Sequence, residues 1–553
     1  MSMMEKSPSH DDGVASPSPS SDPTITPATP DPQYPSPLRL AIIVFALFLA
    51  IFLTALDQTI IGTAIPKITD QFHSVDDVGW YGSAYFLTST ALQPAYGRMY
   101  MLFDVKWSFL VAIFIFELGS LICAVAPNSA TLIGGRAVAG TGVGGIFSGA
   151  LVILSLTVPL KKRPTVFGLF GLVWGLASVV GPLLGGAFTD GPSWRWCFYI
   201  NLPIGAVSVA VIIVILHLPK TAPTGQSFLQ RLVNLDLLGV GFLLPTVVCL
   251  LLALQWGGTT YAWNNSRIIG LFIGFGLILI CFVGSQIWLG DKATLPPRIM
   301  KMRTTISLSC FSLGFGGAYY LLMYYLPIYF QSVRNVSAVH SGIDILPILI
   351  AQSIFSVAIG AGVSAVGYYT PFLIGSTAIF CIGAGLLTLY TTDIPTGKWI
   401  GYQILTGAGV GAGFQIPMTA IQTILDQADI PIGSAAVIFF QSLGGAVFIS
   451  VGESVFENRL AKEIAKNAPQ VSPSLILDAG ATAFRTALAE AGQLDALDAV
   501  LDAYMVGLRD VFRVTLALIL FAFVSSLPLE WKSVKHVAEA KATTPTSEGD
   551  EAA

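Results

Sequence analysis

The chain has 553 residues, of which 54% are hydrophobic and only 11% charged, and its formal net charge is −4. A soluble domain carries about 25% charged residues, so the composition excludes a protein whose whole surface faces water. The largest basic cluster is the run 161–163, which excludes an extended nucleic-acid-binding surface. The six cysteines are dispersed without Cys/His pairing, so we expect neither a metal nor another cofactor.

Apolar blocks of roughly 18 to 25 residues follow one another from residue 39, and this is the length that crosses about 30 Å of hydrocarbon. Residues 1–38 are predicted to be a disordered cytoplasmic tail, because their Ser, Pro and Asp bury little apolar surface. The blocks predict an all-α polytopic membrane protein with fourteen transmembrane helices. Its predicted spans are 39–65, 79–99, 105–126, 130–157, 165–189, 196–218, 236–256, 267–289, 305–331, 341–366, 370–391, 398–425, 431–455 and 509–530.

Similar glycine-rich patterns recur at 140–145 in the fourth span and at 407–413 in the twelfth. They indicate duplicated halves, that is, two six-helix bundles separated by two inserted helices. The alternative is that small residues merely permit close helix packing. The predicted parts are an N-terminal bundle at 39–218, two linker helices at 219–304, a C-terminal bundle at 305–530 and a cytoplasmic tail at 531–553.

Lys and Arg concentrate in the loops that lie on the same side of the membrane as the N-terminus. By the positive-inside rule this side is the cytoplasm, so we predict that both chain ends are cytoplasmic. Two N-x-S sequons, at Asn264 and Asn335, fall in predicted outer loops, where glycosylation is possible. The long outer segment 456–508 is predicted to form an amphipathic surface helix, with a lid as the alternative. We expect a plasma-membrane protein, with a vacuolar or vesicle membrane as the alternative.

The energy source is constrained by a missing motif, since the chain has no G-x-x-x-x-G-K-[ST] phosphate loop for ATP. Coupling to protons requires a titratable group inside the membrane, and such groups are kept there for function. Asp57 in the first span and Arg136 in the fourth lie at matching depths, so we predict that they form the proton-coupling pair. Glu117 in the third span is a second carboxylate. The alternative for these residues is a static network that holds helices together.

The signature residues resemble those of the 14-spanner drug:proton antiporter branch of the major facilitator superfamily, particularly the fungal efflux pumps for toxins and other secondary metabolites. Residues 56–61, LDQTII, are similar to the first-helix signature. Residues 132–136, LIGGR, are similar to the fourth-helix motif, whose arginine is implicated in proton transfer. The resemblance covers 40–455 and 509–530. It implies a transporter, not an enzyme, that exports small, largely apolar organic compounds on the proton gradient.

The fifth span resembles the antiporter motif of this family, and residues 194–203 extend the resemblance into the sixth span. A small-residue row lets two helices approach, and a proline inside a helix bends it, so we predict a conformational gate here. The alternative is a kinked packing helix without a gating role. The gate residues of this span are Gly171, Gly175, Gly181, Pro182, Gly185 and Gly186.

The loop between the second and third spans departs from the family pattern. Met101 stands where the superfamily typically has an aspartate. Arg98 and Lys106 remain as the charges of the predicted inner gate, and whether Asp104 substitutes is left open.

A substrate surface is predicted in the ninth span, where aromatic residues crowd one segment. Tyr320 and Tyr324 share a helical face, and with Gln331 they are predicted to line one cavity wall. Further polar groups lie within apolar blocks and are predicted either to line the cavity or to join helices by hydrogen bonds. These are Gln255, Gln415 and Gln441.

Taken together, these features predict a proton-coupled exporter, acting as a monomer in the lipid bilayer on a small organic substrate. The first alternative is a proton-coupled importer of a nutrient, siderophore or amino acid. A membrane sensor that transports nothing is the alternative of another class. The antiporter pattern of the fifth span argues against import, and the short soluble ends argue against a sensor.

Overall fold

The computed structural model describes residues 35–72, 77–218, 227–258 and 261–537. Most of the two predicted tails therefore lies outside the described residues. The described chain is all-helical, as predicted, and forms no sheet. The first bundle contains α1 (Pro37–Phe72), α2 (Val78–Leu102), α3 (Val105–Ala124), α4 (Ser129–Thr157), α5 (Arg163–Asp190), α6 (Trp196–Tyr199) and α7 (Asn201–Ile215).

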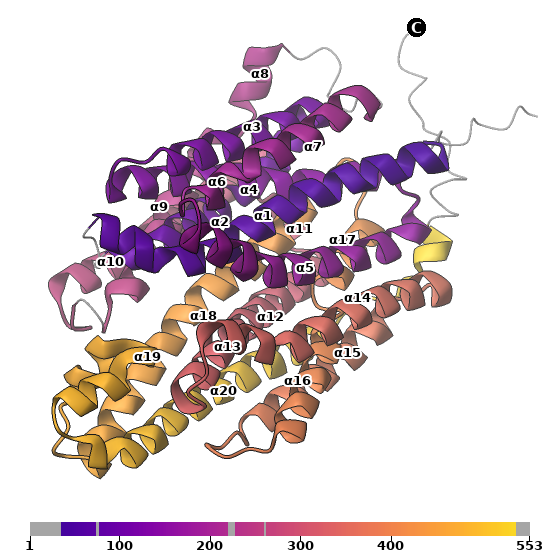
Figure 1. Ribbon diagram of the computed structural model, residues 1–553. Helices are drawn as coiled ribbons and strands as arrows, with labels where there is room; N and C mark the ends of the chain where they lie inside the picture. Colours follow the sequence, from indigo (N-terminus) through magenta and orange to yellow (C-terminus); the bar gives the residue numbers. More distant parts are fainter. Residues whose placement is uncertain (1–34, 73–76, 219–226, 259–260, 538–553) are drawn as a thin grey trace, which may run out of the picture.

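The remaining helices complete the inserted pair and the second bundle (Figure 1). Between the bundles lie α8 (Phe228–Val233), α9 (Leu237–Trp256), α10 (Ser266–Leu289) and α11 (Pro297–Met300). The second bundle contains α12 (Arg303–Ile328), α13 (Ala338–Asp344), α14 (Leu346–Val366), α15 (Thr370–Leu387), α16 (Thr396–Val410), α17 (Gln415–Ile424), α18 (Ile430–Asn467), α19 (Pro473–Glu490) and α20 (Leu497–Ser526). Short turns are η2 (Leu160–Lys162), η3 (Gly290–Lys292), η4 (Tyr329–Val333) and η5 (Leu494–Ala496).

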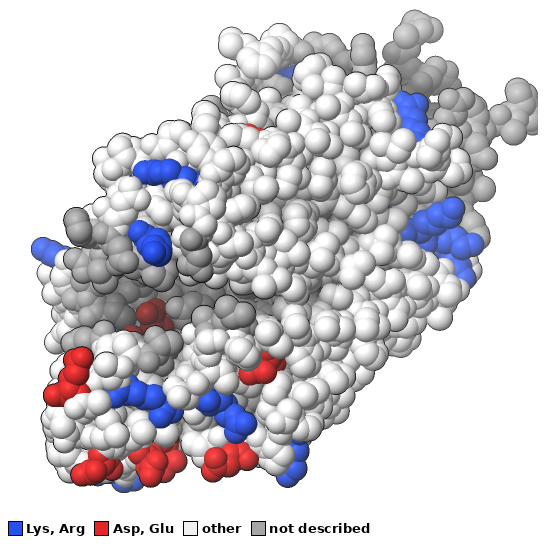
Figure 2. Space-filling model, viewed as in Figure 1, with Lys and Arg blue, Asp and Glu red and all other residues white. Residues whose placement is uncertain are grey.

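Twelve helices of the described chain are long and apolar enough to cross a membrane. The other two predicted spans coincide with α2 and α20, which are 25 and 30 residues long. α2 carries Ser, Thr, Tyr and Gln along its length, and α20 has Arg509, Asp510 and Arg513 near its middle. On the face shown in Figure 2, charged residues gather toward the two ends and leave an uncharged belt between them. The protein is a multi-pass membrane protein.

The two bundles repeat one packing scheme. In the first, α1 packs on α5 and α7, and α4 packs on α2 and α3. In the second, α12 packs on α18 and α20, and α16 packs on α14 and α15. In both bundles the first span therefore packs on the fifth and sixth, and the fourth packs on the second and third. Duplication of a six-helix unit produces this arrangement. The inserted helices α9 and α10 pack on each other, and α9 also contacts α2 and α18.

Glycines occupy equivalent crossings in the two bundles. Gly140 lies against the backbone of α2, and Gly142 lies against that of α3. In the second bundle Gly407 lies against the backbone of α14, and Gly409 lies against that of α15. A Cβ atom at any of the four would overlap backbone atoms of the neighbouring helix. The recurring pattern in the sequence therefore marks the same pair of close helix approaches.

The segment 456–508 does not form the single surface helix that the sequence predicts, but contains parts of three helices. α18 is 38 residues long, about 57 Å at the α-helical rise, so it extends well past about 30 Å of hydrocarbon. Its last turns pack with α19 and with the start of α20. Phe484 of α19 stacks on Tyr504 of α20, with ring centroids 4.8 Å apart. These three helices form a folded cap at one end of the bundle (Figure 1).

Candidate functional site

A charged pair is buried in the middle of the first bundle. Nη1 of Arg136 on α4 lies 2.5 Å from Oδ2 of Asp57 on α1, and the two side chains are 1% and 0% exposed. Asn201 at the start of α7 donates to Oδ1 of Asp57 at 3.0 Å. Arg136 donates through Nε to the carbonyl of Tyr81 at 2.7 Å, and its guanidinium lies 4.3 Å from the ring centroid of Tyr85. The structure brings the predicted pair together.

This pair can exist in a dry interior because its hydrogen-bonding groups have partners. A buried ion pair is tolerated only when geometry is good and the remaining donors and acceptors are satisfied. Asp57 receives two donors from different helices, and Arg136 is held by a carboxylate, a backbone carbonyl and an aromatic face. A change in the charge of Asp57 therefore affects contacts among α1, α2, α4 and α7 together.

Glu117 on α3 lies close to this pair but has no partner of its own. Both carboxylate oxygens are buried and make no hydrogen bond. The carboxylate packs on Gly205 of α7, where an added Cβ would overlap it. Asn201, which holds Asp57, also donates to Ser120 at 3.1 Å, one turn further along α3. An ionised carboxylate without a partner is costly in such a place.

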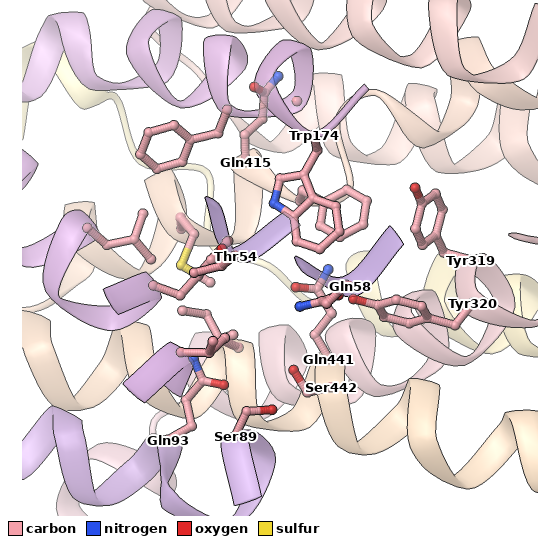
Figure 3. Close-up of a pocket in the computed structure, with 18 of the residues that line it drawn as sticks. Thr54, Gln58, Ser89, Gln93, Trp174, Tyr319, Tyr320, Gln415, Gln441 and Ser442 are labelled. Carbon is pink, nitrogen blue, oxygen red and sulfur yellow. The ribbon is translucent and has the colours of Figure 1, made fainter. Parts of the chain in front are cut away.

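A cavity lies between the two bundles and is lined from both (Figure 3). Aromatic rings and amides dominate its wall. The aromatic residues are Phe86, Phe147, Phe167, Phe170, Trp174, Tyr319, Tyr320 and Phe414. The amides are Gln58, Gln93, Gln352, Gln415 and Gln441. The remaining lining residues are Thr54, Ser89, Val143, Leu151, Gly171, Met418, Ile438 and Ser442.

Three of the six residues predicted to line a cavity do so, namely Tyr320, Gln415 and Gln441. The other three lie elsewhere. Tyr324 lies outside the lining and is 53% exposed, and Gln331 donates to Ser341 at 3.4 Å. Gln255 lies on α9, among the inserted helices.

Sequence reasoning missed the first-bundle amides of the cavity, Gln58 and Gln93, and also Gln352 and Trp174. One signal was available. Gln58 directly follows Asp57 in the signature LDQTII, so the two side chains must leave α1 in different directions. Trp174 lies directly before Gly175 of the fifth-span pattern.

On two helices, residues around the charged pair and residues of the cavity are direct neighbours in sequence. On α1, Asp57 contacts Arg136, and the next residue, Gln58, lines the cavity. On α2, Tyr85 lies under Arg136, and the next residue, Phe86, lines the cavity. The hydroxyl of Tyr85 also donates to the carbonyl of a cavity residue of α1, at 3.3 Å. The two sites are thus separated by one peptide bond on each helix.

The predicted gate glycines of α5 divide between two partners. Gly171 and Gly175 face serines of α14, in the second bundle. Gly181 and Gly185 face threonines of α1, in the first bundle. A Cβ atom added at Gly186 would meet no other atom within 4 Å. Pro182 lies inside the helix, within the second group, directly after Gly181. α5 therefore contacts the opposite bundle with its first half and its own bundle with its second.

Hydrogen bonds close the seam between the bundles where α5 begins. Nη1 of Arg163 donates to Oε1 of Gln422 at 3.2 Å, and Thr165 bonds Ser364 at 2.9 Å. Ser356 of α14 donates to the carbonyl of Gly168 at 3.1 Å. Helices α2 and α18 form the other crossing of the seam.

The two predicted gate cations bind backbone carbonyls. Arg98 is buried and donates to the carbonyls of Asn234 and Asp291 at 3.1 and 2.9 Å. Lys106 donates to two carbonyls at the end of α7, the nearer at 2.7 Å. Asp104 caps α3 by accepting from the backbone of Trp107. Arg98 thus ties α2 to the segments that flank the inserted helices.

The two sequons lie at helix boundaries. Asn264 is exposed in the turn before α10, and Asn335 is exposed after η4 with φ of 53°.

The chain is similar in sequence to known efflux pumps. The sequence model of the Major Facilitator Superfamily matches residues 47–449. The chain is 50% identical over 499 residues to an MFS-type efflux pump of Trichophyton rubrum, covering 90% of this chain and 92% of that one. It is 48% identical over 503 residues to the efflux pump aflT of Aspergillus parasiticus, covering 91% and 97%.

Solved structures show the same fold at low sequence identity. The proton:xylose symporter XylE superposes with a TM-score of 0.57 at 11% identity, covering 91% of this chain and 99% of that one. The human organic anion transporter MFSD10 gives a TM-score of 0.55 at 13% identity, covering 88% and 100%.

Proposed function

Because this chain belongs to the Major Facilitator Superfamily and is a transporter, not an enzyme, we propose that it exports small, largely apolar organic compounds in exchange for protons. The direction of transport is supported by two relatives that are named efflux pumps. Each aligns with about nine-tenths of this chain. The nature of the cargo is supported by the cavity wall, which is mostly aromatic and aliphatic.

One observation carries the proton coupling, namely that Asp57 and Gln58 are neighbours on α1 with one side chain in each site. Protonation of Asp57 removes the negative charge that holds Arg136 and weakens the contact between α1 and α4. The same turn of α1 forms part of the cavity wall. A shift of α1 therefore acts on the bound cargo directly, without passing through another helix. Glu117, buried nearby without a partner, is proposed as a second proton acceptor.

We propose that α5 is the hinge of the conformational cycle. Its first half packs on α14 of the other bundle, and its second half, which contains Pro182, packs on α1 of its own bundle. Seam contacts at the start of α5 close one end of the cavity, and opening that end requires Arg163 and Thr165 to leave their partners on the second bundle. Arg98 holds the flanks of the inserted helices during this movement.

We further propose that α2 and α20 also cross the membrane, giving fourteen spans in the plasma membrane. Each packs within a bundle at the place that a six-helix repeat requires. With cytoplasmic chain ends, the cap of α18 to α20 and the sequons Asn264 and Asn335 lie outside. A monomer contains both bundles and the complete cavity, so no second copy is needed for this scheme.

The test uses sealed inside-out vesicles that contain the full chain, with an acidic interior. An exporter takes up a fluorescent apolar compound into these vesicles, and a protonophore abolishes the uptake. Vesicles without the chain provide the baseline. Uptake that is unchanged by the protonophore would exclude proton coupling, and accumulation only in right-side-out vesicles would indicate import.

A further inference from the structure

The largely apolar cavity wall carries polar groups but no charged ones among the described residues. Among the described residues that line it, none is Asp, Glu, Lys or Arg, although five are glutamines. These glutamines come from both bundles, two from the first and three from the second. The closest described carboxylate along the chain is Asp57, which does not line the cavity and is paired with Arg136.

Part of this amide set is structural and part faces the cavity without a complete set of partners. Gln415 is fixed by two hydrogen bonds with Ser356, one of them 3.0 Å long. Gln352 is only 4% exposed, yet its Oε1 has no hydrogen-bond partner. In Figure 3 the amides of Gln58 and Gln441 converge on the hydroxyl of Tyr320. The cavity therefore presents neutral donors and acceptors at its centre.

The aromatic residues provide flat surfaces around these polar groups. Trp174 of α5 faces the same space as Gln58 and Gln441 (Figure 3). Phe86 of α2 and Tyr320 of α12 meet edge to face across the seam, with centroids 6.4 Å apart. Such rings stack on a flat guest, whereas the amides match its carbonyl and hydroxyl oxygens.

A permanently charged cation is expected to bind less well in this cavity than a neutral guest. It must leave water, and without a carboxylate only amide oxygens and aromatic faces compensate. An aromatic face returns about 0.5–2 kcal/mol, less than the desolvation of a charge costs. On the premise that the cavity carries the exported cargo, we propose that it takes uncharged, flat aromatic compounds with carbonyl and hydroxyl groups and rejects permanent cations of the same size.

The test measures binding by the purified full chain in lipid nanodiscs, separately from transport. The probes are a dihydroxyanthraquinone and the same ring system with one trimethylammonium group. The neutral probe should bind at least about tenfold more tightly, a difference of about 1.4 kcal/mol. Equal or tighter binding of the cation would overturn the proposal and indicate an aromatic cage for cations. Failure of both probes to bind would overturn it too.

Substitutions sharpen this measurement. Gln441→Glu places a carboxylate at the centre of the cavity with little change of shape, so the preference should shift toward the cation by about tenfold. Gln93→Glu provides a second position if the first variant does not fold. The matched control is Gln230→Glu, on the exposed α8, where glutamate also completes a capping box. An unchanged preference in both cavity variants would contradict the proposal.

Failure of this inference is distinguishable from failure of the export function. Vesicles that export the cation but not the neutral compound would refute the charge selectivity and leave proton-driven export standing. Vesicles that export no compound under an imposed pH gradient would remove the export function, and the cargo assignment with it.

Discussion

Arg136 precedes Gly140 by four residues, and in the second bundle Gln403 precedes the equivalent Gly407 by four. The two positions differ in chemistry. Arg136 forms a buried ion pair with Asp57, whereas Gln403 donates to the backbone carbonyl of Asp344 at 3.0 Å. The bundles thus share close glycine crossings but not a charged centre. The difference teaches that packing is common to both halves, whereas the buried ion pair that we propose for proton coupling lies in the first.

The largest expected effect comes from removing the charge in the first bundle. Asp57→Asn keeps the size of the side chain but cannot carry a proton on and off, so proton-driven uptake into inside-out vesicles should fall on the order of a hundredfold. Binding of the neutral cargo should persist. The matched control is Gln403→Glu in the second bundle. When it is combined with Asp57→Asn, proton-driven uptake should not return. Full activity in Asp57→Asn would contradict the assignment.

The next prediction gives the first bundle the residue of the second. Arg136→Gln leaves the Asp57 carboxylate buried without its cation, which should cost about 3–5 kcal/mol and lower the melting temperature. The double variant with Asp57→Asn should recover part of this stability while remaining inactive, because the unpaired charge is gone. Thermal unfolding in nanodiscs measures both. Additive losses in the double variant would show that the pair does not interact.

Packing should respond equally in both halves. Gly142→Val and Gly409→Val each place a side chain against the backbone of a neighbouring helix, and each should cost about 1–3 kcal/mol. The controls are Gly134→Ala and Gly385→Ala, where an added Cβ meets nothing within 4 Å. Melting temperatures of the four variants test the equivalence. A large loss in only one bundle would contradict a shared packing scheme.

The smallest effect is expected at Glu117. Glu117→Gln retains the shape and removes an unpartnered carboxylate, so stability should stay the same or rise by about 1 kcal/mol. If Glu117 accepts a proton during the cycle, the number of protons moved per cargo molecule should fall while cargo binding remains. Simultaneous proton-flux and uptake measurements give this ratio. An unchanged ratio would assign Glu117 to packing alone.

Much of the fold followed from the sequence because lipid imposes a simple rule on helix length and polarity. The rule weakens where polar residues serve another purpose. α18 continues to Asn467, beyond the apolar block that ended at 455, because helix-forming polar residues extend a helix into water. α20 has Arg509 and Asp510 in its interior, where Arg509 donates to the carbonyl of Tyr390 and Asp510 pairs with a basic residue of α18.

The site could be predicted only in part. Matching depths brought Asp57 and Arg136 together, since depth follows from helical rise. Which face of a helix meets the cavity does not follow from periodicity when other helices surround it. Tyr320 and Tyr324 share one face of α12, yet only Tyr320 lines the cavity. Gln352 was missed because its neighbourhood depends on how α14 approaches the first bundle.

The adjacency of Asp57 and Gln58 also bears on how such a protein changes over generations. A substitution at Gln58 alters the cavity wall while the side chain of Asp57 still points toward Arg136. In the proposed scheme, cargo preference and energy source are therefore open to separate mutation, even though both depend on one turn of one helix. A lineage could then acquire resistance to a new toxic compound by changing cavity residues, without first having to rebuild the pair that we propose for proton coupling.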